Sequence, residues 1–266
     1  MKEILNSIIL GIIQGLTEFL PVSSSGHLEI AKFILGDKAI GEESLMMTTV
    51  LHLGTAIATL IVFRKTIYEI VSKIFDKNNH EAKHFVGKIV LSMIPAAFVG
   101  VFFDDIIESF FGGQLLLVSC MLLVTAALLY LADRVKFTSK EVSYTNALII
   151  GISQAIAILP GISRSGATIS TAALLGIDKS KAAEFSFLMV VPLILGKVAK
   201  DLLEGEVGNG VYSYLELFFG FLAALIIGIF ACIWMINIVK SSKLKYFAIY
   251  CTLVGIFGIV YWYSIN

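Results

Sequence analysis

Charged residues are scarce in this chain of 266 residues. Only 15% are Asp, Glu, Lys or Arg, whereas an average soluble domain carries about 25%. A chain so poor in charge cannot cover itself with polar surface, which excludes a disordered protein, a fibre and an ordinary cytosolic domain. Apolar residues make up 58% of the sequence, and the mean hydropathy is +0.90. The composition predicts an integral membrane protein whose partner is the lipid bilayer.

An excess of positive charge is also missing. The 20 basic and 20 acidic residues cancel, so we expect no nucleic-acid partner. Cysteine is limited to Cys120, Cys232 and Cys251, each alone in an apolar run. Three cysteines at these spacings fit neither a disulfide framework nor a metal site, and we interpret them as packing residues.

A cleavage site is absent after the first apolar stretch. Residues 4–20 follow Lys2 as in a signal peptide, but Gln14 and Glu18 interrupt the run and no A-x-A-like site follows. We expect this stretch to remain in the mature protein.

Six stretches are long and apolar enough for a transmembrane helix, which needs about 20 mostly apolar residues. Two other regions, 4–35 and 145–176, are apolar but broken in the middle by proline, glycine and serines. Each predicts two short helices that meet at a break, which survives at membrane depth only where protein or a water-filled cavity satisfies the backbone. The predicted spans are 45–63, 86–103, 115–132, 184–200, 215–239 and 246–264.

Most basic residues lie in four loops, 64–88, 133–144, 177–183 and 240–245. By the positive-inside rule these loops are cytoplasmic. Both termini then lie outside, the first broken region enters from the outer face, and the second enters from the cytoplasm. The intervening loops carry acidic residues, namely Asp104, Asp105, Glu108, Asp201, Glu204 and Glu206.

The two broken regions repeat one pattern at an offset of 140 residues. Three predicted spans separate the copies, and because three is odd the halves are expected to be inverted relative to each other. Inverted repeats with discontinuous helices place their site near the midplane, where the breaks meet. We predict one all-α membrane domain over 1–266, with a first repeat 1–140 and a second repeat 141–266, each a re-entrant helix pair plus three spans. The matched pairs are Gly11 and Gly151, Gln14 and Gln154, Ser23 and Ser163, Ser25 and Ser165, Gly26 and Gly166, and Gly36 and Gly176.

The first break joins a helix end to a helix start. Gln14 and Glu18 are four residues apart and share one helix face. Pro21 ends that helix, because the residue before a proline avoids the helical conformation. The serines at 23–25 are placed to cap the next helix, with His27 in its first turn.

The second break, which starts at Pro160 and Gly161, puts hydroxyl groups and Arg164 at a helix start. Free backbone N–H groups at a helix N-terminus bind anions, and a guanidinium group favours phosphate. Arg164 is the arginine at apparent membrane depth and Glu18 is the matching acid. Buried charges are costly in a bilayer and indicate function, so we predict that Glu18 and Arg164 face each other across the site.

Some of these residues also have a purely structural interpretation. Capping alone would explain Ser23, Ser163 and Gln154, whereas burial of Glu18, His27 and Arg164 together favours function. His52 lies inside a predicted span and is interpreted as a packed, hydrogen-bonded histidine. His80 and His84 are interpreted as part of a solvated loop face, since neither a cysteine nor an HExxH pattern accompanies them.

The two segments resemble the signatures of the bacterial undecaprenyl-diphosphate phosphatase family, the membrane type linked to bacitracin resistance. The family's first motif, E/Q-x-x-x-E followed by P-x-S-S-S/T-G-H, is matched from Gln14 to His27, and the second, P-G-x-S-R-S-x-x-T, from Pro160 to Thr168. The resemblance covers the whole chain. It implies hydrolysis of undecaprenyl diphosphate to the monophosphate and inorganic phosphate at the outer side of the plasma membrane. This reaction recycles the lipid carrier for cell-wall synthesis and gives bacitracin resistance.

The resemblance also implies a divalent cation, Mg²⁺ or Ca²⁺, which would bridge phosphate oxygens. Gln14 stands where some members have glutamate and can supply a carbonyl oxygen but no charge. The attacking group stays open between Ser24, Ser25, His27 and a water that they position. The predicted catalytic residues are Glu18, Ser24, His27 and Arg164; the predicted phosphate-binding residues are Ser23, Ser25, Ser163, Ser165, Gly166 and Thr168; the predicted metal ligands are Gln14 and Glu18.

A different class of protein shares this arrangement of repeats and re-entrant helices. Inverted repeats with re-entrant helices recur in transporters, so a secondary transporter or flippase of a lipid phosphate or small anion is the alternative. An anion carrier has little need for an acid and a histidine beside its phosphate site, which favours the phosphatase. The sequence leaves the oligomeric state open, with a homodimer among the possibilities.

Overall fold

The computed structural model describes residues 2–35, 42–75, 80–103, 106–107, 109–110, 114–135, 139–203, 212–240 and 243–265. In these ranges the regular structure consists of α-helices, with a single bridge between Lys140 and Ile177 as the only β-type pairing. The predicted all-α class is therefore confirmed. Gly36, Asp104, Asp105, Glu108, Glu204 and Glu206, which the sequence argument used, lie outside the described residues.

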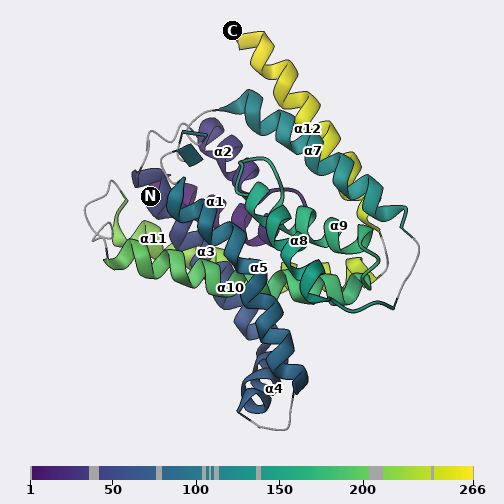
Figure 1. Cartoon of the computed structure of the whole chain (residues 1–266). Coiled ribbons are helices and arrows are strands. Elements are labelled where there is room, and N and C mark those ends of the chain that lie inside the picture. The colour runs from purple at the N-terminus through teal and green to yellow at the C-terminus, as the bar shows by residue number, and fades with distance from the viewer. Residues whose placement is uncertain are drawn as a thin grey trace.

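Eleven helices follow one another along the described chain (Figure 1). They are α1 (Lys2–Phe19), α2 (Ser24–Leu35), α3 (Glu42–Val62), α4 (Arg64–Ile74), α5 (His80–Phe102), α7 (Leu115–Asp133), α8 (Tyr144–Ile156), α9 (Arg164–Leu174), α10 (Lys179–Leu203), α11 (Tyr214–Lys240) and α12 (Leu244–Ile265).

Each of the six predicted spans falls on one long helix, which is α3, α5, α7, α10, α11 or α12. The ends of α7 and α11 agree with the prediction to within one residue, whereas α3, α5, α10 and α12 begin before the predicted start, α5 by six residues. Among the described residues, α5, α7, α11 and α12 are long and apolar enough to cross a membrane, and α3 with α4 makes a fifth span if this bent pair is counted as one. A multi-pass membrane protein is thus established. Crossing by α10, and the total of six spans, stay predictions.

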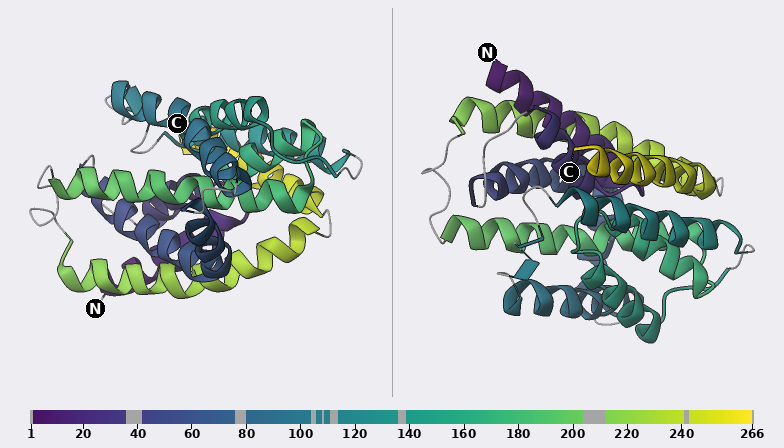
Figure 2. Two further views of the ribbon diagram at one scale, coloured as in Figure 1. Left: turned by 60° about the horizontal axis from the view of Figure 1, so that its bottom comes forward. Right: turned by 90° about the horizontal axis from the view of Figure 1, so that it is seen from above.

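Small residues let the long helices approach closely. Gly15 of α1 faces α11, and a Cβ atom there would lie 2.8 Å from the Ala224 carbonyl oxygen and 2.9 Å from the Gly228 nitrogen. Lipid tails are as apolar as leucine, so helices in a membrane associate through such close backbone contact rather than through the hydrophobic effect. Gly255 of α12 meets α7 at Ser119 in the same way. As Figure 2 shows, α3 lies between α10 and α11 and contacts both.

The two predicted breaks are present. α1 ends at Phe19 and α2 begins at Ser24, while α8 ends at Ile156 and α9 begins at Arg164. α9 is buried along most of its length, because α7, α8 and α10 all pack against it. Phe19 at the end of α1 and Phe187 of α10 pack edge to face, with ring centroids 5.6 Å apart. The breaks therefore lie inside the protein, where polar side chains are shielded from lipid.

α4 differs from the other helices because it projects from the bundle (Figure 1) and has no buried residue. It turns by 73° from α3. Tyr68, Val71 and Phe75 form a stripe at spacings of three and four residues and are 75%, 52% and 83% exposed. Glu69 and Lys73 fall on the opposite side of the helix. An amphipathic helix that turns away from a membrane span is suited to the membrane–water interface.

We expect α4 to lie in the plane of the membrane with this stripe in the lipid. The test places a nitroxide label at Val71→Cys or at the matched neighbour Ser72→Cys, in a variant whose three native cysteines have been replaced. The label at 71 should collide mainly with oxygen dissolved in the lipid, and the label at 72 mainly with a water-soluble nickel complex. Equal accessibility at the two positions would place α4 wholly in water and contradict the expectation.

Candidate active site

Ser23 builds the first break. Its φ of +72° is in the left-handed region that non-glycine residues seldom adopt, and this turn reverses the chain between Pro21 and α2. The Ser23 hydroxyl accepts a hydrogen bond from the Gly26 N–H at 3.2 Å, and its carbonyl accepts the His27 N–H at 3.2 Å. Ser23 is therefore the N-cap of α2, as the sequence predicts.

The second break has the same capping hydrogen bonds, although the backbone differs: Ser163 has φ −70°, whereas Ser23 has φ +72°. The Ser163 hydroxyl accepts the Gly166 N–H at 3.0 Å. The hydroxyl oxygens of Ser163 and Ser165 lie 3.3 Å apart, as do those of Ser23 and Ser25. Both copies of the sequence repeat thus fold into the same capped helix start.

Thr125 of α7 holds the second break in place, and the sequence interpretation missed it. Its hydroxyl accepts the Ser163 N–H at 2.9 Å and donates to the Gly161 carbonyl at 3.1 Å. Gly161 has φ +96°, which only glycine adopts readily. The available signal was a lone hydroxyl residue in the middle of an apolar span, which lipid alone would not satisfy.

Glu18 and Arg164 form the centre of the site. The Arg164 Nη2 donates to Glu18 Oε1 at 2.5 Å, and the two side chains are 15% and 6% exposed. Arg164 Nη1 donates to the Ser186 carbonyl of α10 at 3.2 Å, so the guanidinium group is held on two sides. The prediction that the two charges face each other across the breaks is confirmed, with 146 residues between them in sequence.

Ser24 and Gln14 complete the surroundings of the carboxylate. The Ser24 hydroxyl donates to Glu18 Oε2 at 2.7 Å, and the Gln14 amide donates to the same oxygen at 3.0 Å. A serine hydroxyl bonded to a buried carboxylate is the arrangement that activates a nucleophile. Of the three candidate attacking side chains, Ser24 is the one that the structure places against Glu18.

His52 lies at the edge of this group. Its Nδ1 is 2.8 Å from the Thr48 carbonyl, as expected for a hydrogen-bonded histidine in a helix. Its Nε2, however, lies 3.6 Å from Glu18 Oε2. The sequence interpretation treated His52 as a packing residue and so missed its contact with the site, because α3 and α1 meet only in the tertiary structure.

Gln14 and Glu18 could bind a divalent cation, but they supply only some of the ligands that it needs. Gln14 is fully buried, and its Oε1 has no hydrogen-bond partner within the described chain. It therefore offers a free oxygen ligand next to the Glu18 carboxylate. No group of three or more His, Cys, Asp or Glu gathers among the described residues. A Mg²⁺ or Ca²⁺ ion at Gln14 and Glu18 would thus depend on substrate phosphate oxygens for further ligands, as Mg²⁺ commonly does.

Ser165 and Thr168 are buried in the interior and bonded to protein. The Ser165 hydroxyl lies 3.4 Å from the Leu20 carbonyl, across the two breaks. The Thr168 hydroxyl donates to the Arg164 carbonyl at 2.9 Å and lies 2.6 Å from the hydroxyl of Ser186. Thr168 thereby ties the first turn of α9, which carries Arg164, to α10. Phosphate binding by Ser23, Ser25, Ser163, Ser165, Gly166 and Thr168 stays a prediction.

His27 is separated from the charged pair. Its Nδ1 is 2.8 Å from the Ser23 carbonyl oxygen, and its Nε2 is 2.8 Å from the hydroxyl of Tyr250 on α12. In the part of the chain that the structure describes, neither Glu18 nor Arg164 bonds to this ring. His80 and His84 are exposed, as predicted, but they lie in the first turns of α5 and not in a loop. His84 is hydrogen bonded to Tyr144.

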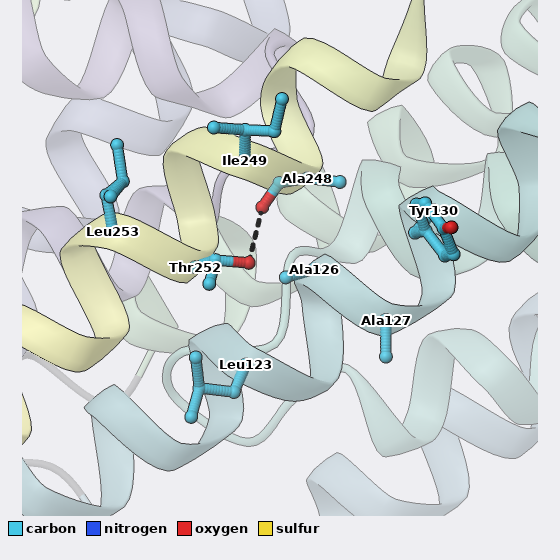
Figure 3. Close-up of a pocket in the computed structure, with 8 residues that line it drawn as sticks. All are labelled: Leu123, Ala126, Ala127, Tyr130, Ala248, Ile249, Thr252 and Leu253. Carbon is cyan, nitrogen blue, oxygen red and sulfur yellow. Dashed lines mark hydrogen bonds between the residues drawn. The ribbon is translucent and has the colours of Figure 1, made fainter.

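A groove of about 370 Å³ lies between α7 and α12 (Figure 3). The hydroxyl of Thr252 donates to the Ala248 carbonyl at 2.9 Å, so that it offers little to a polar ligand. None of the predicted site residues lines this groove, which suits lipid tails rather than phosphate. The lining residues are Leu123, Ala126, Ala127, Tyr130, Ala248, Ile249, Thr252 and Leu253.

The fold and the site together define a multi-pass membrane protein with a buried ion pair where two broken helix pairs meet. Residues 7–257 match the family described as bacitracin resistance protein BacA, and the chain belongs to this family. It is 58% identical over 262 residues to a protein of Christiangramia forsetii named undecaprenyl-diphosphatase, covering 98% of this chain and 99% of that relative. Proteins with the same name from Bacteroides fragilis (50% identity over 262 residues, 97% of this chain and 98% of theirs) and Methanobrevibacter smithii (40% over 273 residues, 96% of each) are also similar. The family resemblance seen in the two motifs is thereby confirmed.

Proposed function

We propose that this protein is an undecaprenyl-diphosphatase, which hydrolyses undecaprenyl diphosphate to undecaprenyl phosphate and inorganic phosphate. The observation that carries the mechanism is the chain of contacts from Ser24 through Glu18 to Arg164 at the meeting point of the two breaks. The names of the relatives support the substrate. The product returns the lipid carrier to cell-wall synthesis, and bacitracin resistance follows from this recycling.

Arg164 binds the phosphates. Its planar guanidinium group can share donors between Glu18 and the substrate, and it stabilises the negative charge on the phosphoryl oxygens in the transition state. The N-termini of α2 and α9 add backbone N–H groups and the positive ends of their dipoles. The prenyl chain stays in the lipid while the diphosphate enters between the breaks.

Ser24 is the nucleophile. Glu18 takes the proton of the Ser24 hydroxyl, the oxygen attacks the terminal phosphorus, and the bond from that phosphorus to the bridging oxygen breaks. Undecaprenyl phosphate leaves and a phosphoserine remains. Water then attacks the phosphoserine phosphorus and gives a proton to His27. The bond from that phosphorus to the Ser24 oxygen breaks, Glu18 returns its proton to this oxygen, and inorganic phosphate leaves. When bound through Gln14 and Glu18, Mg²⁺ or Ca²⁺ supplies positive charge that neutralises the phosphate oxygens.

The site opens to the outer side of the bacterial plasma membrane, with both termini outside. The concentration of basic residues in segments 64–88, 133–144, 177–183 and 240–245 supports this orientation. The matching capping hydrogen bonds of Ser23 and Ser163 support two inverted repeats, each a re-entrant pair with three spans.

Phosphate release from a prenyl diphosphate by the detergent-purified protein tests this function. We expect turnover with Mg²⁺ or Ca²⁺, and a loss of at least about tenfold in chelator, since a bound cation supplies several kcal/mol of charge stabilisation. Glu18→Ala should be inactive, and the exposed carboxylate variant Glu141→Gln should match the wild type. Full activity in chelator would remove the cation from the mechanism. Absence of release from folded protein would replace the phosphatase by a lipid-phosphate carrier, measured as flux in liposomes.

A further inference from the structure

Tyr250 contacts the His27 ring from a distant helix. It lies on α12, in sequence 223 residues from His27, and belongs to neither motif. Its ring stacks on the imidazole at an interplanar angle of 11° with centroids 5.6 Å apart. Its hydroxyl lies 2.8 Å from Nε2. The two rings are therefore nearly parallel and displaced sideways, and the phenol hydroxyl contacts one nitrogen of the imidazole.

The two bonds of His27 determine its tautomer. The Ser23 carbonyl oxygen can only accept, so Nδ1 carries the hydrogen and donates to it. In the neutral imidazole Nε2 then has the lone pair, and Tyr250 donates its O–H to it. The Ser23 carbonyl cannot exchange a proton with Nδ1. His27 can therefore gain or lose a proton only at Nε2, which is hydrogen bonded to the Tyr250 hydroxyl.

A tyrosine hydroxyl suits this position because it can donate or accept. It donates to Nε2 when the imidazole is neutral, passes that proton to Nε2 as it takes one from the water, and accepts from Nε2–H once the ring is protonated. The hydrogen bond, and with it the orientation of the ring, is kept through the proton cycle. Phenylalanine preserves the stacking but provides neither bond.

We propose that Tyr250 is a positioning residue of the active site: it holds the His27 imidazole through a hydrogen bond that persists in both protonation states. The inference rests on the proposed function, in which His27 accepts a proton from water in the second half of the reaction. It adds α12 to the elements that build the site, and it explains why an α12 tyrosine points at the first break.

The test is a double-mutant cycle between His27→Ala and Tyr250→Phe, with kcat and KM measured for phosphate release. Tyr250→Phe should lower kcat by about 10- to 100-fold, the usual effect of removing a partner that orients a reactive group, with KM within about twofold. In the His27→Ala protein the same change should have no further effect. Tyr246→Phe is the matched control, because it removes a hydroxyl from an exposed ring one turn earlier on α12, and it should equal the wild type.

Melting temperatures of the four proteins separate positioning from folding, and Tyr250→Phe should melt with the wild type. The ¹⁵N shifts of His27 give an independent measure: loss of the hydroxyl should change the Nε2 signal and leave Nδ1 protonated. A wild-type kcat for Tyr250→Phe, or equal losses in both backgrounds, would overturn the proposal while the phosphatase stands. Full turnover of His27→Ala would overturn the role of His27 and of Tyr250 together. Absence of turnover in the wild type would instead overturn the proposed function.

Discussion

Arg164→Lys is expected to lower kcat by about 10²- to 10³-fold and Arg164→Ala by more, the range for loss of a donor that stabilises transition-state charge. Lysine keeps the positive charge but not the planar fork. The guanidinium group reaches Glu18 Oε1 and the Ser186 carbonyl at once through its two terminal nitrogens. A point charge on a flexible stem cannot hold both partners and also bind a phosphate bidentately.

The measurement is kcat and KM for phosphate release from a prenyl diphosphate. A loss mainly in kcat would indicate contacts made in the transition state, whereas a rise in KM alone would indicate binding of the substrate ground state. Arg64→Lys is the control, because Arg64 is exposed on α4 and bonds to the Ile61 carbonyl. Turnover close to the wild type in Arg164→Ala would disprove the role of Arg164.

The second large effect concerns how much the ion pair of Glu18 and Arg164 contributes to the stability of the folded protein. Removing one partner of a buried ion pair leaves an uncompensated charge, which costs about 3–5 kcal/mol, while replacing both partners is close to neutral. Glu18→Gln and Arg164→Gln should therefore each lower the melting temperature in detergent, and the double variant should recover much of the loss. Turnover should not recover, because the double variant lacks both the base and the phosphate-binding arginine.

The exposed pair of Glu141 and Lys181 is the matched control for this cycle. Its atoms approach to 2.6 Å, close to the distance in the buried pair. The hydrogen bond between them lowers the pKa of Glu141 and raises that of Lys181. Water competes for these groups, so the cycle there should show little coupling. Equal coupling in both cycles would mean that burial does not strengthen the pair of Glu18 and Arg164.

Prediction from sequence succeeded where the signal is local. Pro21 and Pro160 mark breaks, and Ser23 and Ser163 follow them at the spacing that an N-cap requires. These features involve a few neighbouring residues, so no tertiary information was needed. The pairing of Glu18 with Arg164 was predicted across 146 residues because two opposite charges in an apolar chain have few other ways to be satisfied.

Prediction failed where two helices distant in sequence supply one contact. Three residues contact the site from helices whose sequences predict ordinary transmembrane spans. They are Thr125, Ser186 and Tyr250. A hydroxyl in an apolar run predicts that it has a partner but not which one. His52 shows the same limit, since a histidine bonded to its own helix and one beside a carboxylate have the same sequence signal.

The amino-acid sequence by itself determined that this protein is a helical membrane protein with two capped breaks, and that a carboxylate and a guanidinium meet between them. Composition, proline and capping act within one helix or loop, and the high cost of an unpaired charge in lipid restricts what the charges can do. Only the tertiary structure decided that Ser24 rather than His27 lies against Glu18, and that α12 bonds to His27. Those outcomes depend on how closely glycine and other small residues let the helices pack, which no local pattern encodes.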